Sequence, residues 1–228
     1  EFSSLDELII FCSKGKNSGD GFLLGSYAKE FGLQVTIVMS NSASELKGVS
    51  KKAFLEMKES KVKVITTKSI GKLKVSNNAV IVDALIGTGL KGIPRKNIKD
   101  SILAINQLGI KLPVVSLDIP SGVNPDTGSV NDVCVFADIT ATFVANKRGC
   151  FTSVGKKVSG EIIYSELDIP SKIFSNVAST SSLISHEDKI DKVVYREEDS
   201  HKGHFGHVVV IGGDIGLGGA GILASKAA

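Results

Sequence analysis

The stretch LIIFCSKGKNSGDGFLLGSYAKE (residues 8–30) determines how the rest of the chain is interpreted. An apolar run, residues 8–12, leads into a glycine-rich segment, and a helical pattern follows from about Gly19 to Glu30, with Phe22, Leu23, Tyr27 and Phe31 on its apolar side. A strand, a glycine loop and a helix in this order are typical of α/β folds that hold phosphates. Asp20 is then unexpected, because it puts a carboxylate into such a loop.

This glycine loop matches neither common nucleotide-binding fingerprint. Gly15, Gly19 and Gly21 lack the G-x-G-x-x-G spacing, and Asn17 stands where a P-loop needs Ser or Thr. The missing fingerprint disfavours an ordinary NAD-dependent oxidoreductase. Two interpretations of Asp20 remain open: it accepts hydrogen bonds from the first amides of the helix, or it binds ligand hydroxyls.

Strand-like and helical patterns alternate as far as residue 170, which predicts an α/β fold. We expect a Rossmann-like three-layer sandwich with a mostly parallel central sheet and helices on both faces. Helices are predicted near 43–60 and 97–109. Strands are predicted in GLQVTIVM (32–39), KVKVIT (61–66), NAVIVDALIG (78–87), KLPVVSLDIP (111–120), DITATFVAN (138–146) and, at an edge, GEIIYSELDIP (160–170).

The chain divides into three parts by composition. Residues 1–170 form the predicted α/β domain, 171–200 are polar and read as a linker, and 201–228 begin a second strand–glycine loop–helix pattern. The sequence starts nearly at a strand and ends inside a helical pattern, so we expect that both ends are cut.

Bulk properties exclude some partners. The 228 residues carry 27 Lys and Arg against 24 Asp and Glu, a net charge of +3 with scattered lysines, which argues against a nucleic-acid partner. No stretch approaches a membrane span, so no membrane partner is expected. The three cysteines have no metal-like spacing and fit reduced thiols in a cytoplasmic protein.

Two aspartates lie in or at the end of predicted buried strands, and each is followed by a loop rich in glycine or proline. Asp83 lies within an apolar strand, in VDALIGTGLKG (82–92), and a buried unpaired carboxylate needs a cation or several donors. Its glycines let backbone N–H groups approach an anion. Asp118 ends the strand in LDIPSG (117–122), where Pro120 fixes the exit. The alternative for Asp83 is a loop with an incidental aspartate at the strand end, and the alternative for the Asp118 segment is a simple Pro/Gly turn.

The polar strand ends are expected to meet. In an open parallel sheet, ligands bind at the carboxyl ends of the strands. The loops after Cys12, Asp83 and Asp118 and the segment ANKRG (145–149) all lie there. Asn17, Asp83 and Ser121 supply hard oxygen ligands, which suit a weakly hydrated monovalent cation better than zinc. For the two cations of ANKRG, a solvated surface is the alternative.

Together, DALIGTGLKG and LDIPSG resemble the NAD(P)H-hydrate epimerase family (YjeF N-terminal domain), over roughly residues 8–170, with an N-terminal helix missing here. KGHFGHVVVIGGDIGLGGAGILASKAA (202–228) resembles the start of an ADP/ATP-dependent NAD(P)H-hydrate dehydratase, as in a bifunctional repair protein. The resemblance implies epimerisation of the R and S hydrates of NADH and NADPH, one K⁺ per epimerase site, ADP or ATP for the dehydratase, and a homo-oligomer.

The resemblance also implies site residues. The catalytic residue would be Asp118, and the potassium ligands would be Asn17, Asp83 and Ser121. Ala220 would bind the dehydratase substrate. The hydrated nucleotide would contact Lys16, Asn17, Ser18, Gly19, Asp20, Gly87, Thr88, Gly89, Leu90, Lys91, Gly92, Ile93, Asp118 and Lys147.

The first loop departs from the family pattern. Ser13, Lys16 and Ser18 stand where the family has Gly, Asn and Gly, and Ser18 would restrict a positive φ. A catalytically weak or inactive scaffold module of the same fold therefore remains the alternative to an enzyme.

Overall fold

The structure, a computed structural model, describes residues 5–90, 92–174, 176–177, 179, 181–184 and 198–228. The chain splits into two compact units, Glu1–Ala178 and Ser179–Ala228. This division falls inside the polar segment predicted as a linker, of which residues 185–197 lie outside the described residues. In the described part of the chain, none of the helices has the length and apolar character that crossing a membrane requires.

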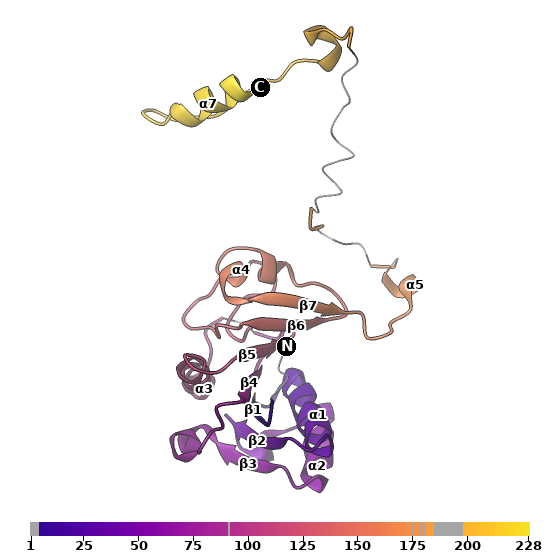
Figure 1. Cartoon of the computed structure of the whole chain (residues 1–228), viewed down its shortest axis with the longest axis vertical. Helices are drawn as coiled ribbons and strands as arrows, with labels where there is room; N and C mark the ends of the chain where they lie inside the picture. The colour runs from indigo at the N-terminus through magenta and orange to yellow at the C-terminus, as the bar shows by residue number, and fades with distance from the viewer. Residues whose placement is uncertain (1–4, 91, 175, 178, 180, 185–197) are drawn as a thin grey trace. The chain divides into compact units, whose positions relative to one another are not determined.

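A seven-stranded sheet forms the centre of the first unit (Figure 1). Its order is β3-β2-β1-β4-β5-β6-β7, and every neighbouring pair is parallel, which confirms the predicted fold class. The strand predicted at an edge, β7, lies at an edge. The strands are β1 (Glu7–Cys12), β2 (Gln34–Met39), β3 (Lys63–Thr66), β4 (Ala79–Ala84), β5 (Val114–Leu117), β6 (Ile139–Phe143) and β7 (Glu161–Ser165).

Helices cover both faces of this sheet. On one side lie α1 (Lys16–Glu30) and α2 (Gly48–Glu59), and on the other lies α3 (Lys96–Leu108). The shorter elements are η1 (Ala43–Glu45), η2 (Thr67–Lys72), η3 (Arg148–Phe151), α4 (Gly155–Val158) and α5 (Ser171–Phe174). The segment predicted as one helix near 43–60 is thus η1 followed by α2.

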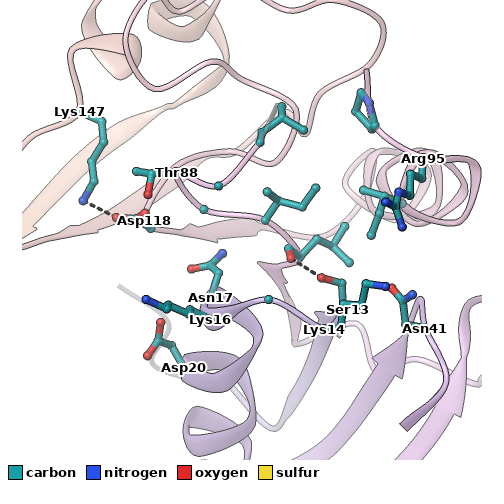
Figure 2. Close-up of a pocket in the computed structure, with 18 of the residues that line it drawn as sticks. Ser13, Lys14, Lys16, Asn17, Asp20, Asn41, Thr88, Arg95, Asp118 and Lys147 are labelled. Atoms are coloured by element: carbon teal, nitrogen blue, oxygen red, sulfur yellow. Dashed lines mark hydrogen bonds and ion pairs between the residues drawn. The ribbon is translucent and has the colours of Figure 1, made fainter. Parts of the chain in front are cut away.

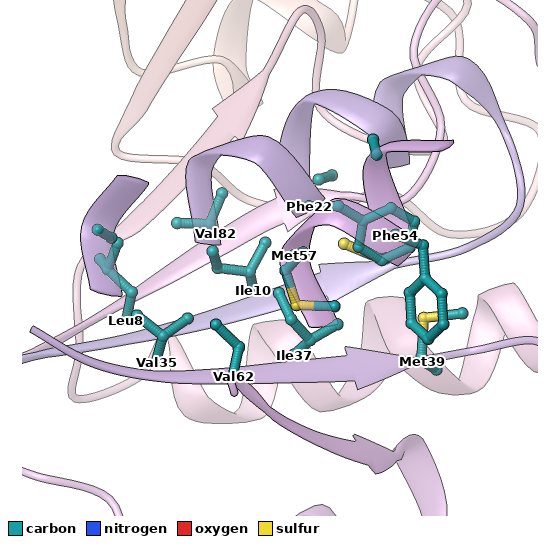
Figure 3. Close-up of a cluster of buried hydrophobic side chains, with 14 of the residues drawn as sticks. Leu8, Ile10, Phe22, Val35, Ile37, Met39, Phe54, Met57, Val62 and Val82 are labelled. Carbon is teal, nitrogen blue, oxygen red and sulfur yellow. The ribbon is translucent and has the colours of Figure 1, made fainter. Parts of the chain in front are cut away.

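Alternation along the strands divides the core into two clusters. Leu8 and Ile10 of β1 pack toward α1 and α2, whereas Ile9 and Phe11 pack toward α3. Figure 3 shows the first cluster, in which the ring of Phe22 from α1 meets that of Phe54 from α2 edge-on, 5.2 Å between centroids. These packed layers hold the carboxyl ends of the central strands in fixed positions.

The buried side of α1 differs from its predicted apolar side. Phe22 is fully buried, but Tyr27 and Phe31 are exposed. Glycine makes the contact instead: a Cβ added at Gly21 would lie 2.6 Å from the Ala84 Cβ. The helix therefore packs by close backbone approach, which a search for large apolar residues does not detect.

The second unit contains η4 (Lys202–Phe205) and α7 (Gly219–Ala227). The helix of the predicted strand–glycine loop–helix pattern is present, but its strand is not, and Val208, Val209 and Ile211 are exposed. A strand needs a neighbour for its backbone hydrogen bonds, and the described part of this unit contains none. The limits of the second domain stay a prediction.

Candidate functional site

A cavity of about 1120 Å³ opens at the carboxyl ends of the central strands. Its wall comes from the segments after β1, β2, β4, β5 and β6, where the sequence predicted convergence of four loops. Figure 2 shows the Asp118 and Lys147 side chains at one end and those of Arg95 and Asn41 at the other. This volume is above the range usual for small-molecule pockets, and a dinucleotide is a larger ligand than most.

One wall of the cavity is the start of α1. This helix begins at Lys16, three residues before the start predicted at Gly19. Gly15 is its N-cap and no side chain caps it, so the interpretation of Asp20 as a cap is wrong. Asp20 lines the pocket instead, and burial by the pocket wall raises its pKa, which the nearby Asp118 carboxylate raises further. The carboxylate in the glycine segment is thus a pocket group on a helix.

Ser18 is the third residue of this helix, so the expected conflict with a positive φ is wrong. Its Oγ accepts a hydrogen bond from the Ser13 amide at 2.7 Å and donates one to the Ala84 carbonyl, also at 2.7 Å. Ser13 Oγ donates to the Leu85 carbonyl at 2.6 Å. Both serines therefore tie the start of α1 to the end of β4 and need no glycine conformation.

Asp118 is held in an unusual geometry at the end of β5. Its φ is +71°, in the left-handed region that few non-glycine residues adopt, and its amide donates to the Ala141 carbonyl at 2.7 Å. Its carboxylate forms an ion pair with the ammonium of Lys147, and both side chains are mostly buried. Lys147 also donates to the Phe143 carbonyl at 2.7 Å. Strain of this kind is found at functional sites.

Three of the predicted motifs meet at Gly87. A Cβ added there would lie 2.8 Å from Asp118 Oδ2 and 3.5 Å from the side chain of Asn17. Only a glycine lets the loop after β4 approach the start of α1 and the end of β5 this closely.

Asp83 is completely buried behind this wall. Its carboxylate accepts hydrogen bonds from Ser121 Oγ at 2.6 Å, the Ser121 amide at 2.8 Å, Ser116 Oγ at 2.9 Å and the Leu85 amide at 3.2 Å. Burial raises the pKa of Asp83, while these donors oppose the rise. No cationic side chain in the described part of the chain pairs with it.

The predicted potassium ligands are chemically suited to a hard cation. Asp83 and Ser121 are in direct contact, and Asn17 reaches the end of β5 by donating its Nδ2 to the Leu117 carbonyl at 3.1 Å. If the Asn17 side-chain amide were flipped, exchanging Oδ1 and Nδ2, Oδ1 would face the Leu117 carbonyl oxygen. Two oxygens would then face each other where a cation could bind both. A buried carboxyl group that no cationic side chain of the described residues pairs with fits such a site. No cluster of three or more His, Cys, Asp or Glu side chains that could hold a metal occurs among the described residues.

The structure brings most of the predicted nucleotide contacts to the pocket. Ser18 and Gly19 are buried outside the lining, Gly92 lies outside it, and Lys91 is outside the described residues. Ala220 lies in α7 of the second unit. The lining includes Lys16, Asn17, Asp20, Gly87, Thr88, Gly89, Leu90, Ile93, Asp118 and Lys147.

Sequence reasoning missed the other end of the pocket. Its polar lining comes from Lys14, Asn41, Arg95 and Asn97. Asn41 follows the end of β2, so the rule that ligands bind at the carboxyl ends of strands already pointed to it. Arg95 had no such signal, because it lies just before a helix whose position relative to the sheet only the fold determines.

Comparisons with known proteins agree on one family. A family model described as "YjeF-related protein N-terminus" matches residues 2–149. The bifunctional NAD(P)H-hydrate repair enzyme Nnr of Coxiella burnetii is 38% identical over 222 residues, which are 97% of this chain and 44% of that protein. The Nnr enzyme of Escherichia coli is 31% identical, over 96% of this chain and 42% of its own length.

The chain thus spans less than half the length of these relatives. Among solved structures, the crystal structure of yeast ynu0 superposes with a TM-score of 0.63 at 18% identity, covering 82% of this chain and 78% of the yeast chain. At that identity the likeness concerns the fold alone.

Proposed function

The chain belongs to the YjeF-related N-terminal family, and on this premise we propose that residues 1–170 interconvert the R and S forms of hydrated NADH and NADPH. The observation that carries the proposal is the ion pair of Asp118 and Lys147 on the wall of a dinucleotide-sized pocket. Relatives that share the family are named as NAD(P)H-hydrate repair enzymes.

The reaction needs a group that moves a proton at C6 of the hydrated ring. C6 is a hemiaminal carbon: protonation of its hydroxyl lets water leave, and the electron pair on the ring nitrogen stabilises the resulting cation. Water then adds to the opposite face and loses a proton. We assign the proton transfers and the stabilisation of the cation to Asp118, with Lys147 holding its carboxylate in place.

The anionic part of the substrate has suitable partners near the start of α1. The amides of its first turn have no side-chain cap, and Lys16 lines the pocket beside them. Helix N-termini bind phosphate groups through such amides. We therefore assign the pyrophosphate to this segment and to the glycines after β4.

We also propose one potassium ion beside Asn17, Asp83 and Ser121, supported by the oxygen chemistry of the set and by the buried charge of Asp83. When bound, the ion would neutralise Asp83 and fix the loops after β4 and β5.

For the longer protein we propose an ADP- or ATP-dependent, S-specific dehydratase that begins near residue 201. We further expect the protein to form a homo-oligomer and to lie in the cytoplasm. The three free buried cysteines support the cytoplasmic location, because thiols stay reduced there.

The decisive experiment follows R-to-S interconversion on the purified chain. Epimer-enriched hydrated NADH and NADPH are incubated with the protein, and the two epimers are separated by chromatography over time. We expect interconversion well above the spontaneous rate measured without protein. Binding of the hydrate without any acceleration would instead support the scaffold alternative.

A further inference from the structure

The end of the pocket away from Asp118 has a composition of its own. We call it the Arg95 end and define it by Lys14, Asn41, Arg95 and Asn97 (Figure 2 labels three of them). The acidic side chains of the described lining, Asp20 and Asp118, both lie away from it in that view. The Arg95 end therefore differs in charge from the end assigned to the reacting ring.

Within the part of the chain that the structure describes, Arg95 is the cation of this end without a protein partner. Lys14 is neutralised by Glu45, with Nζ and Oε2 2.8 Å apart. That carboxylate also accepts from Asn41 Nδ2 at 3.0 Å and from the Ser42 amide at 3.3 Å, so its acceptor positions are largely used. Arg95, by contrast, has no hydrogen bond or ion pair from its side chain to any described residue. Its guanidinium is exposed and available to a ligand.

The wall that carries Arg95 is rigid. Asn97 Nδ2 donates to the Ser40 carbonyl and to Asn41 Oδ1, both at 3.0 Å, which ties the start of α3 to the end of β2. Pro94, which is buried and immediately precedes Arg95, has a fixed φ of its own and restricts the backbone of Ile93. Arg95 and the residues after β2 thus form one built surface.

The residue type after β2 decides which adenosine ribose such a fold accepts. In Rossmann-type sheets a carboxylate at this place binds the 2′-hydroxyl of NAD, and an arginine nearby accommodates the 2′-phosphate of NADP. Here Ser40 and Asn41 stand after β2, and the carboxylate that contacts Asn41, that of Glu45, is already paired with Lys14. An unpaired guanidinium is well suited to a phosphate, because its planar N–H groups match two phosphate oxygens.

We propose that the Arg95 end receives the 2′-phosphate of the adenosine ribose, so that the chain favours hydrated NADPH over hydrated NADH. This rests on the proposed function, because it places the adenosine at the end of the pocket opposite the reacting ring. Arg95 is then a residue that determines specificity and takes no part in the chemistry.

Two adenosine nucleotides test the site without the nicotinamide ring. Adenosine 2′,5′-bisphosphate and adenosine 5′-monophosphate are titrated calorimetrically into the 228-residue chain at constant ionic strength. We expect the bisphosphate to bind about tenfold to a hundredfold more tightly, the effect of one charge-assisted contact. Arg95→Gln should remove this difference and leave monophosphate binding within about twofold.

Lys96→Gln is the matched control, because Lys96 is the adjacent exposed cation and does not line the pocket. It should keep the preference for the bisphosphate. In the epimerase assay, Arg95→Gln should raise KM for hydrated NADPH and leave KM for hydrated NADH unchanged.

The inference is overturned if the wild-type chain binds both nucleotides equally, or if Arg95→Gln weakens both to the same extent, as a contact to the 5′-phosphate would. Bisphosphate preference in a chain that does not epimerise would overturn only the proposed activity. Epimerisation with no effect of Arg95→Gln on the preference would overturn only the inference.

Discussion

Asp118 combines a left-handed backbone, an ion pair and a position on the pocket wall. Asparagine tolerates the left-handed region better than most residues, so Asp118→Asn should fold normally while losing the charge and the proton transfer. General acid–base catalysis contributes roughly 10²–10⁴-fold, so we expect at least about a hundredfold lower epimerisation rate. The rate is measured as R-to-S conversion over time.

Asp126→Asn is the control for this substitution, since Asp126 lies in an exposed turn outside the pocket. It should epimerise at the wild-type rate. A near wild-type rate for Asp118→Asn would reduce Asp118 to a binding or structural residue. Asp20 would then be the next candidate, because it lines the same pocket with a raised pKa.

Asp83 makes potassium binding measurable through stability. If the ion binds the native state alone, replacing choline by potassium at constant ionic strength should raise the free energy of unfolding, by up to about 2.7 kcal/mol at a hundredfold excess over Kd. Asp83→Asn should lose this response. Because that variant also disturbs four hydrogen bonds, Asn17→Ala serves as the second test, and potassium stabilisation that survives both changes would contradict the site.

The same residue sets a pH dependence. Burial raises the pKa of Asp83 above its unfolded value, so without potassium the native state binds this proton more readily than the unfolded state does. The contribution of Asp83 to the free energy of unfolding is fully present below its unfolded pKa. It is lost as the pH rises through the folded pKa. The free energy of unfolding of the wild type minus that of Asp83→Asn is measured by denaturant titration from about pH 4, the unfolded pKa, upward. This difference should fall with pH in choline and fall less in potassium.

At the scale of elements, the contact of α1 with the sheet depends on Gly21. A Cβ there would come within 2.6 Å of Ala84 and 2.9 Å of the Cys12 sulfur, so Gly21→Ala should destabilise the fold by about 1–3 kcal/mol. Gly19→Ala is the matched substitution on the same helix: its Cβ would meet Ser50 at an ordinary 3.6 Å.

Gly19→Ala should therefore leave stability unchanged or raise it by up to about 1 kcal/mol, because alanine is the better helix former. Denaturant midpoints of the two variants give the comparison. Equal midpoints would mean that α1 does not pack as closely on β1 and β4 as the structure has it.

At the scale of the molecule, the buried clusters of the first unit involve residues from Leu8 to Val158. The second unit leaves large apolar side chains exposed, such as Ile211 and Ile215. We therefore expect a chain ending at residue 178 to unfold in the same cooperative transition as the 228-residue chain, with its midpoint shifted by less than about 2 °C. A loss of cooperativity would show that residues 179–228 complete the first core.

The sequence by itself determined the α/β class, the parallel sheet and most strands, because short apolar runs rich in β-branched residues, such as 78–87, indicate a buried strand when turn signals bound them. It also indicated the rim at which Asp20, Asp83 and Asp118 gather, since the carboxyl ends of parallel strands share one edge. Helix starts and short-range contacts were less accessible, because α1 is positioned by the hydrogen bonds of Ser13 and Ser18 with β4.

Only the tertiary structure decided what each polar residue contacts. The pairing of Asp118 with Lys147 joins residues from two strand ends, and the close approach at Gly87 depends on three segments at once. Arg95 became a candidate for binding a phosphate because its side chain pairs with no described residue. A local sequence pattern cannot predict this. The physical reason is the same in each case: sequence periodicity reports which face of an element is buried, whereas charge pairing and ligand contacts depend on distances between elements that only packing sets.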